Sequence, residues 1–370
     1  MIYFHIPFCR HACVYCDFHF NTSLRFLPDL YQALHQEIDY RKAEIPQICE
    51  SIYFGGGTPS VLTSQQIADL IIHVKQISKI SSEAELTLEA NPEDLSPEFL
   101  KEIHEAGINR LSIGIQSFED EFLHFMNRKH SAQQAIDCVN AASRAGFTDI
   151  SIDLIYGIPG MSNNTWMNAI KTASLLPVNH LSCYALTVEP QTPLAKKIIS
   201  GKVAAASDEQ SSEQFEILRQ HASELGFIHY EVSNFQRNNS PAKHNSAYWS
   251  GKPYIGIGPS AHSFNGTQRR VNIAHNRQYF EGLLKGDCPH EIEQIDSITR
   301  YHEIVLTGIR TKKGINLSEI NKTGEITSTH FIDTLKKHRS KFSISENFAS
   351  LNQDYWIVAE NIALDFFIDK

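Results

Sequence analysis

The sequence lacks any apolar run long enough to span a bilayer, so no transmembrane segment is expected. Its first residues, MIYFHIPFC, include neither a basic region nor a cleavage site, which predicts a cytoplasmic protein. Basic residues are not in excess either: 33 Lys and Arg stand against 42 Asp and Glu, for a net charge of -9. This charge disfavours broad binding to nucleic acid or anionic lipid. The expected partners are therefore small molecules or proteins, and a homodimer remains open.

Cysteine is scarce, with seven residues in 370, and the count is odd. In a chain without a secretion signal, these features argue against a disulfide framework and favour metal or redox chemistry. Three of the seven, Cys9, Cys13 and Cys16, lie close together directly after the first predicted strand. Three thiolates suit an Fe–S cluster in which one iron stays open for another ligand. Two alternatives remain open: three inert thiols, or a zinc site completed by one of three nearby histidines, His5, His11 or His19.

Short apolar runs recur along the first half of the chain, and each is followed by a loop and a helical pattern. This repetition predicts a parallel sheet with right-handed helical crossovers, built either as an open sheet or as a complete or partial barrel. The runs cover residues 2–6, 52–54, 85–88, 111–115, 150–155 and 181–186.

Capping residues mark where several helices begin. Thr63 with Gln66 forms a capping-box pattern. Ser96 before Pro97 is typical of a helix start, and Gly107 is placed to end that helix. The same signals predict two more helices, over residues 131–146 and 207–226.

The alternation of strands and helices weakens after about residue 205, which predicts three regions. Residues 1–205 form the βα core, and residues 206–290 extend it. Residues 291–370 form a smaller, mainly helical C-terminal domain that begins with a helix over residues 297–311.

The ends of the predicted strands carry residues suited to ligand binding. The second strand runs into Gly-Gly-Gly-Thr-Pro at residues 55–59, a loop whose backbone can approach a ligand closely, although a tight turn is the alternative. Glu89, Gln116 and Asp153 end the third, fourth and fifth strands. Because parallel sheets and barrels bind ligands at the carboxyl ends of their strands, these side chains are expected to meet at one mouth.

The cysteine spacing Cys-x3-Cys-x2-Cys after the first strand, together with the glycine-rich loop after the second, resembles radical S-adenosylmethionine (SAM) enzymes. The resemblance implies a partial parallel (β/α)6-type radical SAM barrel and a [4Fe–4S] cluster on Cys9, Cys13 and Cys16. It also implies that the open iron chelates the amino and carboxylate groups of SAM, whose reductive cleavage gives methionine and a 5′-deoxyadenosyl radical. The protein would then position and shield the reacting groups.

Longer strings, Tyr-x-His-Ile-Pro-Phe-Cys and Ile-Asp-Leu-Ile-Tyr-Gly-Ile-Pro-Gly, resemble the oxygen-independent coproporphyrinogen III oxidase group of that superfamily. The resemblance covers most of the chain and implies which residues contact SAM. These are Tyr3, Tyr15, Gly56, Gly57, Thr58, Glu89, Gln116, Arg128, Asp153 and Ala185.

Two branches of the group are distinguished by short patterns. The decarboxylase branch carries one more cysteine two residues after the third cluster ligand, and a segment ahead of the first strand. Here Phe18 occupies that position and the first strand begins at the N-terminus, which is expected to disfavour decarboxylation. The string His244-Asn-Ser-Ala-Tyr248-Trp249 instead resembles the His-Asn-x-x-Tyr-Trp string of HemW-type heme chaperones.

The second resemblance implies a heme carrier that uses the cluster and SAM and delivers heme to respiratory hemoproteins. His244 is the candidate heme ligand and His262 a second one; in isolation, each is as well explained by a histidine that is bonded within the fold. The competing hypotheses are oxidative decarboxylation of coproporphyrinogen III and a zinc-stabilised binding protein.

Overall fold

A computed structural model describes residues 1–238 and 241–369 and is organised around a nine-stranded sheet with the order β7-β8-β6-β5-β4-β3-β2-β1-β9. Its central strands are parallel, each hydrogen-bonded to the next along the chain. They are β1 (Ile2–Ile6), β2 (Ile48–Gly56), β3 (Lys79–Ala90), β4 (Arg110–Gln116), β5 (Asp149–Tyr156) and β6 (His180–Ala185). The predicted parallel α/β core is therefore confirmed, and each predicted apolar run lies on one of these strands, the last reaching one residue past β6.

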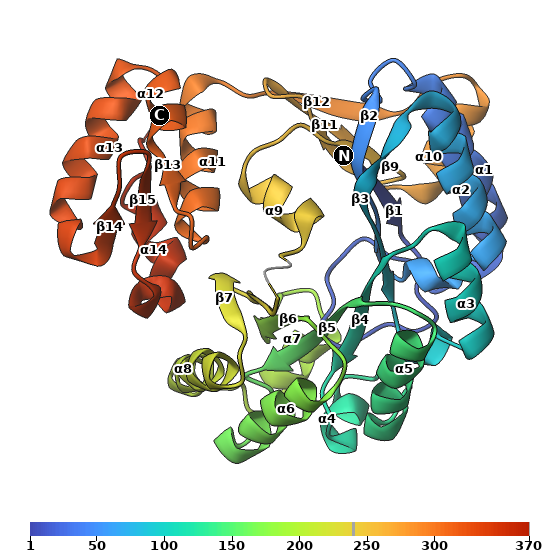
Figure 1. The fold of residues 1–370 in the computed structure, drawn as a ribbon, viewed down its shortest axis with the longest axis horizontal. Coiled ribbons are helices and arrows are strands. Elements are labelled where there is room, and N and C mark those ends of the chain that lie inside the picture. The colour runs from blue at the N-terminus through green and yellow to red at the C-terminus, as the bar shows by residue number, and fades with distance from the viewer. Residues whose placement is uncertain (239–240, 370) are drawn as a thin grey trace.

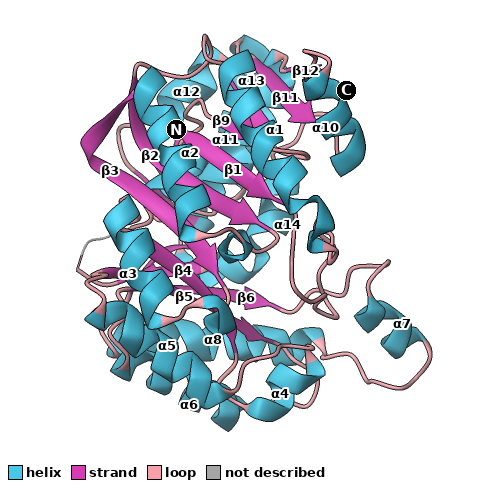
Figure 2. Ribbon diagram, turned by 90° about the vertical axis from the view of Figure 1, so that its right-hand side faces the viewer, coloured by secondary structure: helices cyan, strands magenta, loops and turns pink. Residues whose placement is uncertain are grey.

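Helices cover the outer side of the curved sheet (Figure 1). They are α1 (Leu27–Tyr40), α2 (Ser64–Ile77), α3 (Pro97–Ala106), α4 (Asp120–Phe125), α5 (Ala132–Arg144), α6 (Asn163–Leu175) and α8 (Asp208–Glu224). In Figure 2 the arrowheads of β1 and β6 point towards the side where α7 (Pro193–Ile199) lies at the end of a long loop. The carboxyl ends of the parallel strands thus open on that side.

The predicted capping residues begin and end these helices. Thr63 and Gln66 form a reciprocal capping box at the start of α2. Ser96 accepts a hydrogen bond from the backbone N–H of Phe99, and Gly107 ends α3 in the left-handed region with φ 109°. Helices α5 and α8 begin directly after Ser131 and Ser207, as predicted. Local hydrogen bonding of this kind fixes helix ends independently of tertiary packing.

Three further strands of the main sheet come from residues beyond 205. β8 (Asn234–Gln236) pairs antiparallel with β6 and with β7 (Ile228–Glu231), whereas β9 (Ile255–Ile257) pairs parallel with β1. The short helix α9 (Lys243–Trp249) lies between these strands in the chain. In Figure 1 α9 stands between the main sheet and the C-terminal elements.

The rest of the chain forms two small antiparallel sheets with their helices. The first sheet contains β10 (His262–Phe264), β11 (Gln268–Asn272) and β12 (His290–Gln294), with α10 (Asn276–Leu284) in the same stretch. The second contains β13 (Ile315–Asn316), β14 (Phe342–Ile344) and β15 (Phe348–Leu351), beside α11 (Ser297–Ile309), α12 (Leu317–Lys322), α13 (Glu325–Lys337) and α14 (Ala359–Leu364). None of the helices in the described residues is long and apolar enough to cross a membrane.

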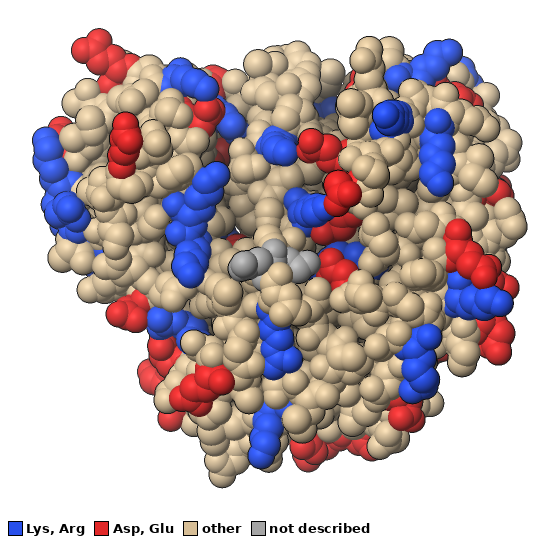
Figure 3. Space-filling view, in the orientation of Figure 1, with Lys and Arg blue, Asp and Glu red and all other residues tan. Residues whose placement is uncertain are grey.

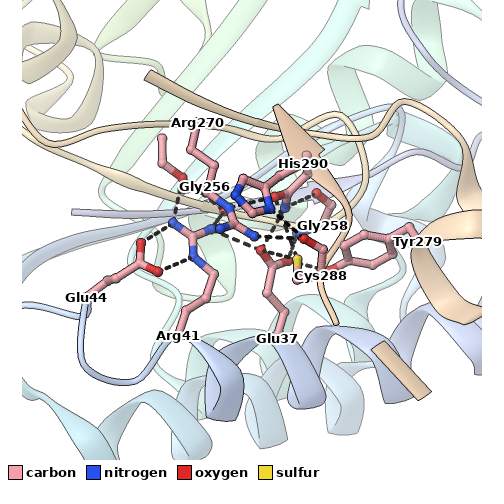
Figure 4. Close-up of polar contacts among 11 residues, drawn as sticks. Glu37, Arg41, Glu44, Gly256, Gly258, Arg270, Tyr279, Cys288 and His290 are labelled. Carbon is pink, nitrogen blue, oxygen red and sulfur yellow. Dashed lines mark hydrogen bonds and ion pairs between the residues drawn. The ribbon is translucent and has the colours of Figure 1, made fainter. Parts of the chain in front are cut away.

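A buried polar network joins α1 to β9 and to the first small sheet (Figure 4). Arg41 pairs with Glu37 at 3.0 Å, and both side chains are fully buried. Glu37 also accepts hydrogen bonds from the backbone of Gly258 at 2.7 Å and from the hydroxyl of Tyr279. Arg41 donates to the carbonyl oxygen of Gly256 at 2.7 Å. Because the backbone on both sides of Ile257 depends on these bonds, the ion pair holds the edge strand β9 in place.

The four cysteines outside the N-terminal cluster are buried and unpaired. Cys49, Cys138 and Cys183 lie in the hydrophobic core. Cys288 lies beside the Glu37 network, with its Sγ 3.6 Å from a carboxylate oxygen of Glu37. Cys49, Cys138 and Cys183 therefore fill space in the interior, as small apolar side chains do.

Candidate functional site

The loops after β1 and β2 pack against each other and bring the first cluster cysteine to the glycine-rich loop. The backbone N–H of Gly57 donates to the carbonyl of Ile6 at 2.9 Å, and that of Thr58 donates to Phe8 at 2.8 Å. The Thr58 hydroxyl lies 3.3 Å from Cys9 Sγ. A Cβ at Gly57 would stand 2.8 Å from the Phe8 carbonyl oxygen and 3.0 Å from Cys9 Sγ. Glycine is therefore required at position 57 by close approach of the two loops.

The three clustered cysteines are free thiols at the partly exposed mouth of the sheet. Burial raises the pKa of Cys9 to about 11 and also raises that of Cys16, so these groups are protonated at neutral pH unless a metal displaces the proton. Three unpaired thiols in a hydrogen-bonded loop fit the ligand requirement of an Fe–S cluster. Within residues 1–238 and 241–369, no group of three His, Cys, Asp or Glu side chains, the three cysteines included, has the spacing that would hold a metal ion, so the geometry favours neither the cluster nor the zinc alternative.

Two partly buried carboxylates line the same mouth, Glu89 near the end of β3 and Asp153 in the second half of β5, three residues before its end. Glu89 accepts a hydrogen bond from the Tyr53 hydroxyl at 2.7 Å and from the backbone N–H of Gly56 at 3.2 Å. Asp153 accepts one from the hydroxyl of Ser112 at 3.3 Å. Desolvation by burial raises the pKa of Glu89 to about 7 and that of Asp153 to about 6. Both acceptors are thus held in place for a ligand that supplies hydroxyl or ammonium donors.

Arg128 supplies the positive charge of this mouth. Its guanidinium donates to Asn91 Oδ1 at 2.7 Å and to the carbonyl of Gly114 at 2.6 Å, and lies 3.5 Å from Cys13 Sγ. Its Nε is buried and has no hydrogen-bond partner among the described residues. Each of these partners is a neutral group or a thiol, so the guanidinium is available for a ligand carboxylate. Asn91 was missed in the sequence, although it stands two residues after Glu89 in Glu-Ala-Asn-Pro.

Of the remaining predicted SAM contacts, Gln116 and Ala185 end their strands, whereas Tyr3 lies near the start of β1. Gln116 ends β4 with φ 72°, a left-handed conformation that is strained for a residue with a side chain. Tyr3 lies on β1 and bonds His5 Nδ1 at 3.0 Å. Tyr15 lies in the cysteine loop and packs against the core, and burial raises its pKa. Ala185 ends β6, opposite Tyr156. The role of each as a SAM contact stays a prediction.

His244 lies on the face of α9 that packs on β2, where its ring centroid is 5.0 Å from that of Tyr53 and 6.5 Å from that of Tyr3. Its Nδ1 lies 2.8 Å from Ser51 Oγ and its Nε2 lies 3.1 Å from the Tyr248 hydroxyl. The residue is only 1% exposed, and burial lowers its pKa to about 3. Heme ligation by His244 stays a prediction, and it requires one of these two hydrogen bonds to break. His262 is exposed and lines a cavity of about 300 Å³ together with Tyr3 and His5.

The comparison with known proteins decides the family. Residues 3–173 match the radical SAM superfamily. The chain is 35% identical to the heme chaperone HemW of Bacillus subtilis over 318 residues, which cover 85% of this chain and 84% of that protein. It is 36% identical to the heme chaperone HemW of Mycobacterium tuberculosis over 326 residues, covering 86% and 83% of the two chains. This chain belongs to the HemW family of radical SAM proteins.

The solved structure of coproporphyrinogen III oxidase (HemN) from Escherichia coli has the same fold as this HemW-family chain. The two superpose with a TM-score of 0.85 at 22% sequence identity, covering 99% of this chain and 89% of that one. The radical SAM fold expected from the cysteine pattern is thereby confirmed. Membership of the superfamily implies a [4Fe–4S] cluster and SAM; that Cys9, Cys13 and Cys16 hold the cluster in this HemW-family protein stays a prediction.

The two carboxylates predict a pH-dependent stability of the cluster-free protein. Because burial raises the folded-state pKa of Glu89 to about 7 and of Asp153 to about 6, their contribution to stability is fully present below about pH 4 and is lost as pH rises through these values. Between pH 5 and pH 8, ionisation of each carboxylate should lower the free energy of unfolding by roughly 1–3 kcal/mol. In urea unfolding at the two pH values, Glu89→Gln and Asp153→Asn are expected to lose less stability than the wild type. Equal losses in all three proteins would contradict the assigned pKa shifts.

Proposed function

We propose that this protein is a cytoplasmic heme carrier that holds a [4Fe–4S] cluster with SAM and delivers heme to respiratory hemoproteins. The observation that carries the proposal is the identity of about 35% with HemW heme chaperones over most of both chains. The His-Asn-x-x-Tyr-Trp string supports it, since α9 packs against both the barrel wall and the C-terminal elements.

The cluster and SAM would occupy the mouth formed by the cysteine loop and the strand ends. Cys9, Cys13 and Cys16 would hold the cluster, which supplies one-electron chemistry to SAM when bound. Arg128 would neutralise the SAM carboxylate, while Glu89 and Asp153 would accept hydrogen bonds from its amino and hydroxyl groups. Gly56 and Gly57 keep the loop backbone close to these groups and leave no room for side chains there.

Coproporphyrinogen III decarboxylation is the second candidate, and the HemN-like fold favours it. Against it stands Phe18, which occupies the position of the additional cysteine of the decarboxylase pattern. Its ring is 68% exposed beside the cysteine loop and offers neither a thiol nor a proton donor. For this reason we place the carrier function first.

Heme titration of the anaerobically reconstituted protein tests the proposal. The wild type is expected to bind one equivalent of heme with a shifted Soret band and a dissociation constant in the micromolar range or below, because a carrier must compete with nonspecific adsorption of heme. The heme-loaded protein is then mixed with an apo-hemoprotein, and transfer is expected to appear as the spectrum of the acceptor. A spectrum that remains that of free heme at all protein concentrations would rule the carrier function out.

A further inference from the structure

A groove of about 410 Å³ lies between α9 and the C-terminal elements, on the opposite side of α9 from the buried His244. Its apolar walls are the ring of Trp249 from α9, Ile304 from α11 and Phe348 from β15. This volume is within the range of small-molecule sites, and the mainly apolar lining suits a flat, largely hydrophobic ligand. Figure 3 views this face and shows charged side chains of both signs over the region where α9 lies in Figure 1.

The charge at the groove favours an anionic ligand. Lys312, Lys313 and Arg300 line it; Arg300 is paired with Glu303 at 3.5 Å, and the acidic residue of the lining, Glu319, is paired with Lys322 at 2.6 Å. Lys312 and Lys313 are exposed, and within the described residues neither ammonium lies within 4.0 Å of a carboxylate oxygen. Lys313 Nζ instead lies 4.8 Å from the centroid of the Phe348 ring. Two unpaired ammonium groups at the rim of an apolar groove suit a ligand with carboxylates at one edge.

Trp249 differs from the other two tryptophans in its hydrogen bonding. Of the three tryptophans, Trp166 donates its indole N–H to the carbonyl of Gln214 at 2.9 Å, and Trp356 donates to that of Leu351 at 3.2 Å. The indole Nε1 of Trp249 is equally buried but has no partner among the described residues. Because this N–H has almost no accessible surface, Trp249 contributes its ring and not its donor to the groove, and the guanidinium of Arg310 lies 5.4 Å from the ring centroid.

We propose that this groove is the tetrapyrrole site: the porphyrin plane packs on Trp249, Ile304 and Phe348, and its carboxylates meet Lys312 and Lys313. The inference rests on the proposed carrier function and assigns it a location. His244 then acts as a positioning residue, because its bonds to Ser51 and to Tyr248 hold α9 on β2 while the opposite face of the helix forms the groove wall. Because binding at this site depends on the porphyrin plane and its carboxylates, the dissociation constant of iron-free protoporphyrin IX is expected to lie within a few-fold of that of heme.

The test is an anaerobic titration of the full-length, cluster-loaded protein with heme, protoporphyrin IX and heme dimethyl ester, followed by tryptophan fluorescence and Soret absorbance. The variant Lys312→Glu/Lys313→Glu should bind heme and protoporphyrin IX at least tenfold more weakly than the wild type. The dimethyl ester, which lacks the carboxylates, should bind the variant and the wild type alike. Trp249→Phe should bind heme more weakly than the wild type.

Two matched variants make the outcome decisive. Lys336→Glu/Lys337→Glu makes the same change in net charge as Lys312→Glu/Lys313→Glu, but on α13, outside the groove. It should leave the affinity for heme unchanged. His244→Gln should change affinity less than the groove variant does. If heme binds the wild type but Lys312→Glu/Lys313→Glu binds it equally well, or if only His244→Gln loses binding, the groove assignment is wrong and the carrier function stands. If the wild type binds neither heme nor protoporphyrin IX, the groove assignment and the carrier function are both wrong.

Discussion

Replacing Cys9, Cys13 and Cys16 together by Ala is expected to abolish the broad brown absorbance of the reconstituted protein and to remove its bound iron and labile sulfide. The reason is that an Fe–S cluster is held mainly by thiolates, and these three free thiols belong to the loop that packs against Thr58 and Gly57. The result is read from the absorption spectrum and from iron and sulfide analysis under anaerobic conditions.

The control for this variant removes thiols elsewhere. Cys49 and Cys183 are buried in the core, so their replacement by Ala should leave iron and sulfide at the wild-type level. Iron and sulfide retained in the triple variant would place the cluster elsewhere or show that none is bound. Zinc in place of iron and sulfide in the wild type would favour the structural zinc site.

Arg41→Met is expected to lower the free energy of unfolding by about 3–5 kcal/mol, the usual cost of removing one partner of a fully buried ion pair. Glu37 would then keep a buried negative charge and lose its 3.0 Å contact with Arg41. The backbone carbonyl of Gly256 and the hydroxyl of Ser263 would also lose their donor. Urea unfolding followed by circular dichroism measures the loss.

The matched control is Glu44→Gln, which removes the other carboxylate partner of Arg41. The Glu44 side chain is 48% exposed, so this ion pair should contribute no more than about 1 kcal/mol. If Arg41→Met costs no more than Glu44→Gln, the buried network does not stabilise β9 in the way described. Arg41 belongs to both ion pairs, one fully buried with Glu37 and one partly exposed with Glu44, so the comparison separates the effect of burial from that of removing a charge.

The parts of the fold that depend on local sequence could be predicted. Apolar runs followed by helical patterns located the six central strands, and Thr63, Ser96, Ser131 and Ser207 cap helices because their hydroxyls bond backbone groups a few residues away. Residues at the ends of parallel strands share one mouth by topology, which is why Glu89, Gln116 and Asp153 were found without any knowledge of the packing.

Features that depend on distant pairing could not be predicted. β9 pairs with β1 although some 250 residues separate them, and a three-residue strand has no periodicity of its own. The bonds of His244 to Ser51 and Tyr248 arise only when α9 docks on β2. The heme role of His244 was predicted from the resemblance of its string to HemW-type proteins and stays a prediction; the hydrogen bonds of its two ring nitrogens could not be read from the sequence.

The carrier account is tested most directly by mass spectrometry of the porphyrin fraction after the cluster-loaded protein is incubated anaerobically with SAM, reductant and coproporphyrinogen III. The account predicts that coproporphyrinogen III is recovered unchanged from protein that still binds SAM and heme, since Phe18 replaces the additional cysteine of the decarboxylase pattern. A product that has lost two carboxyl groups would contradict it and establish a decarboxylase.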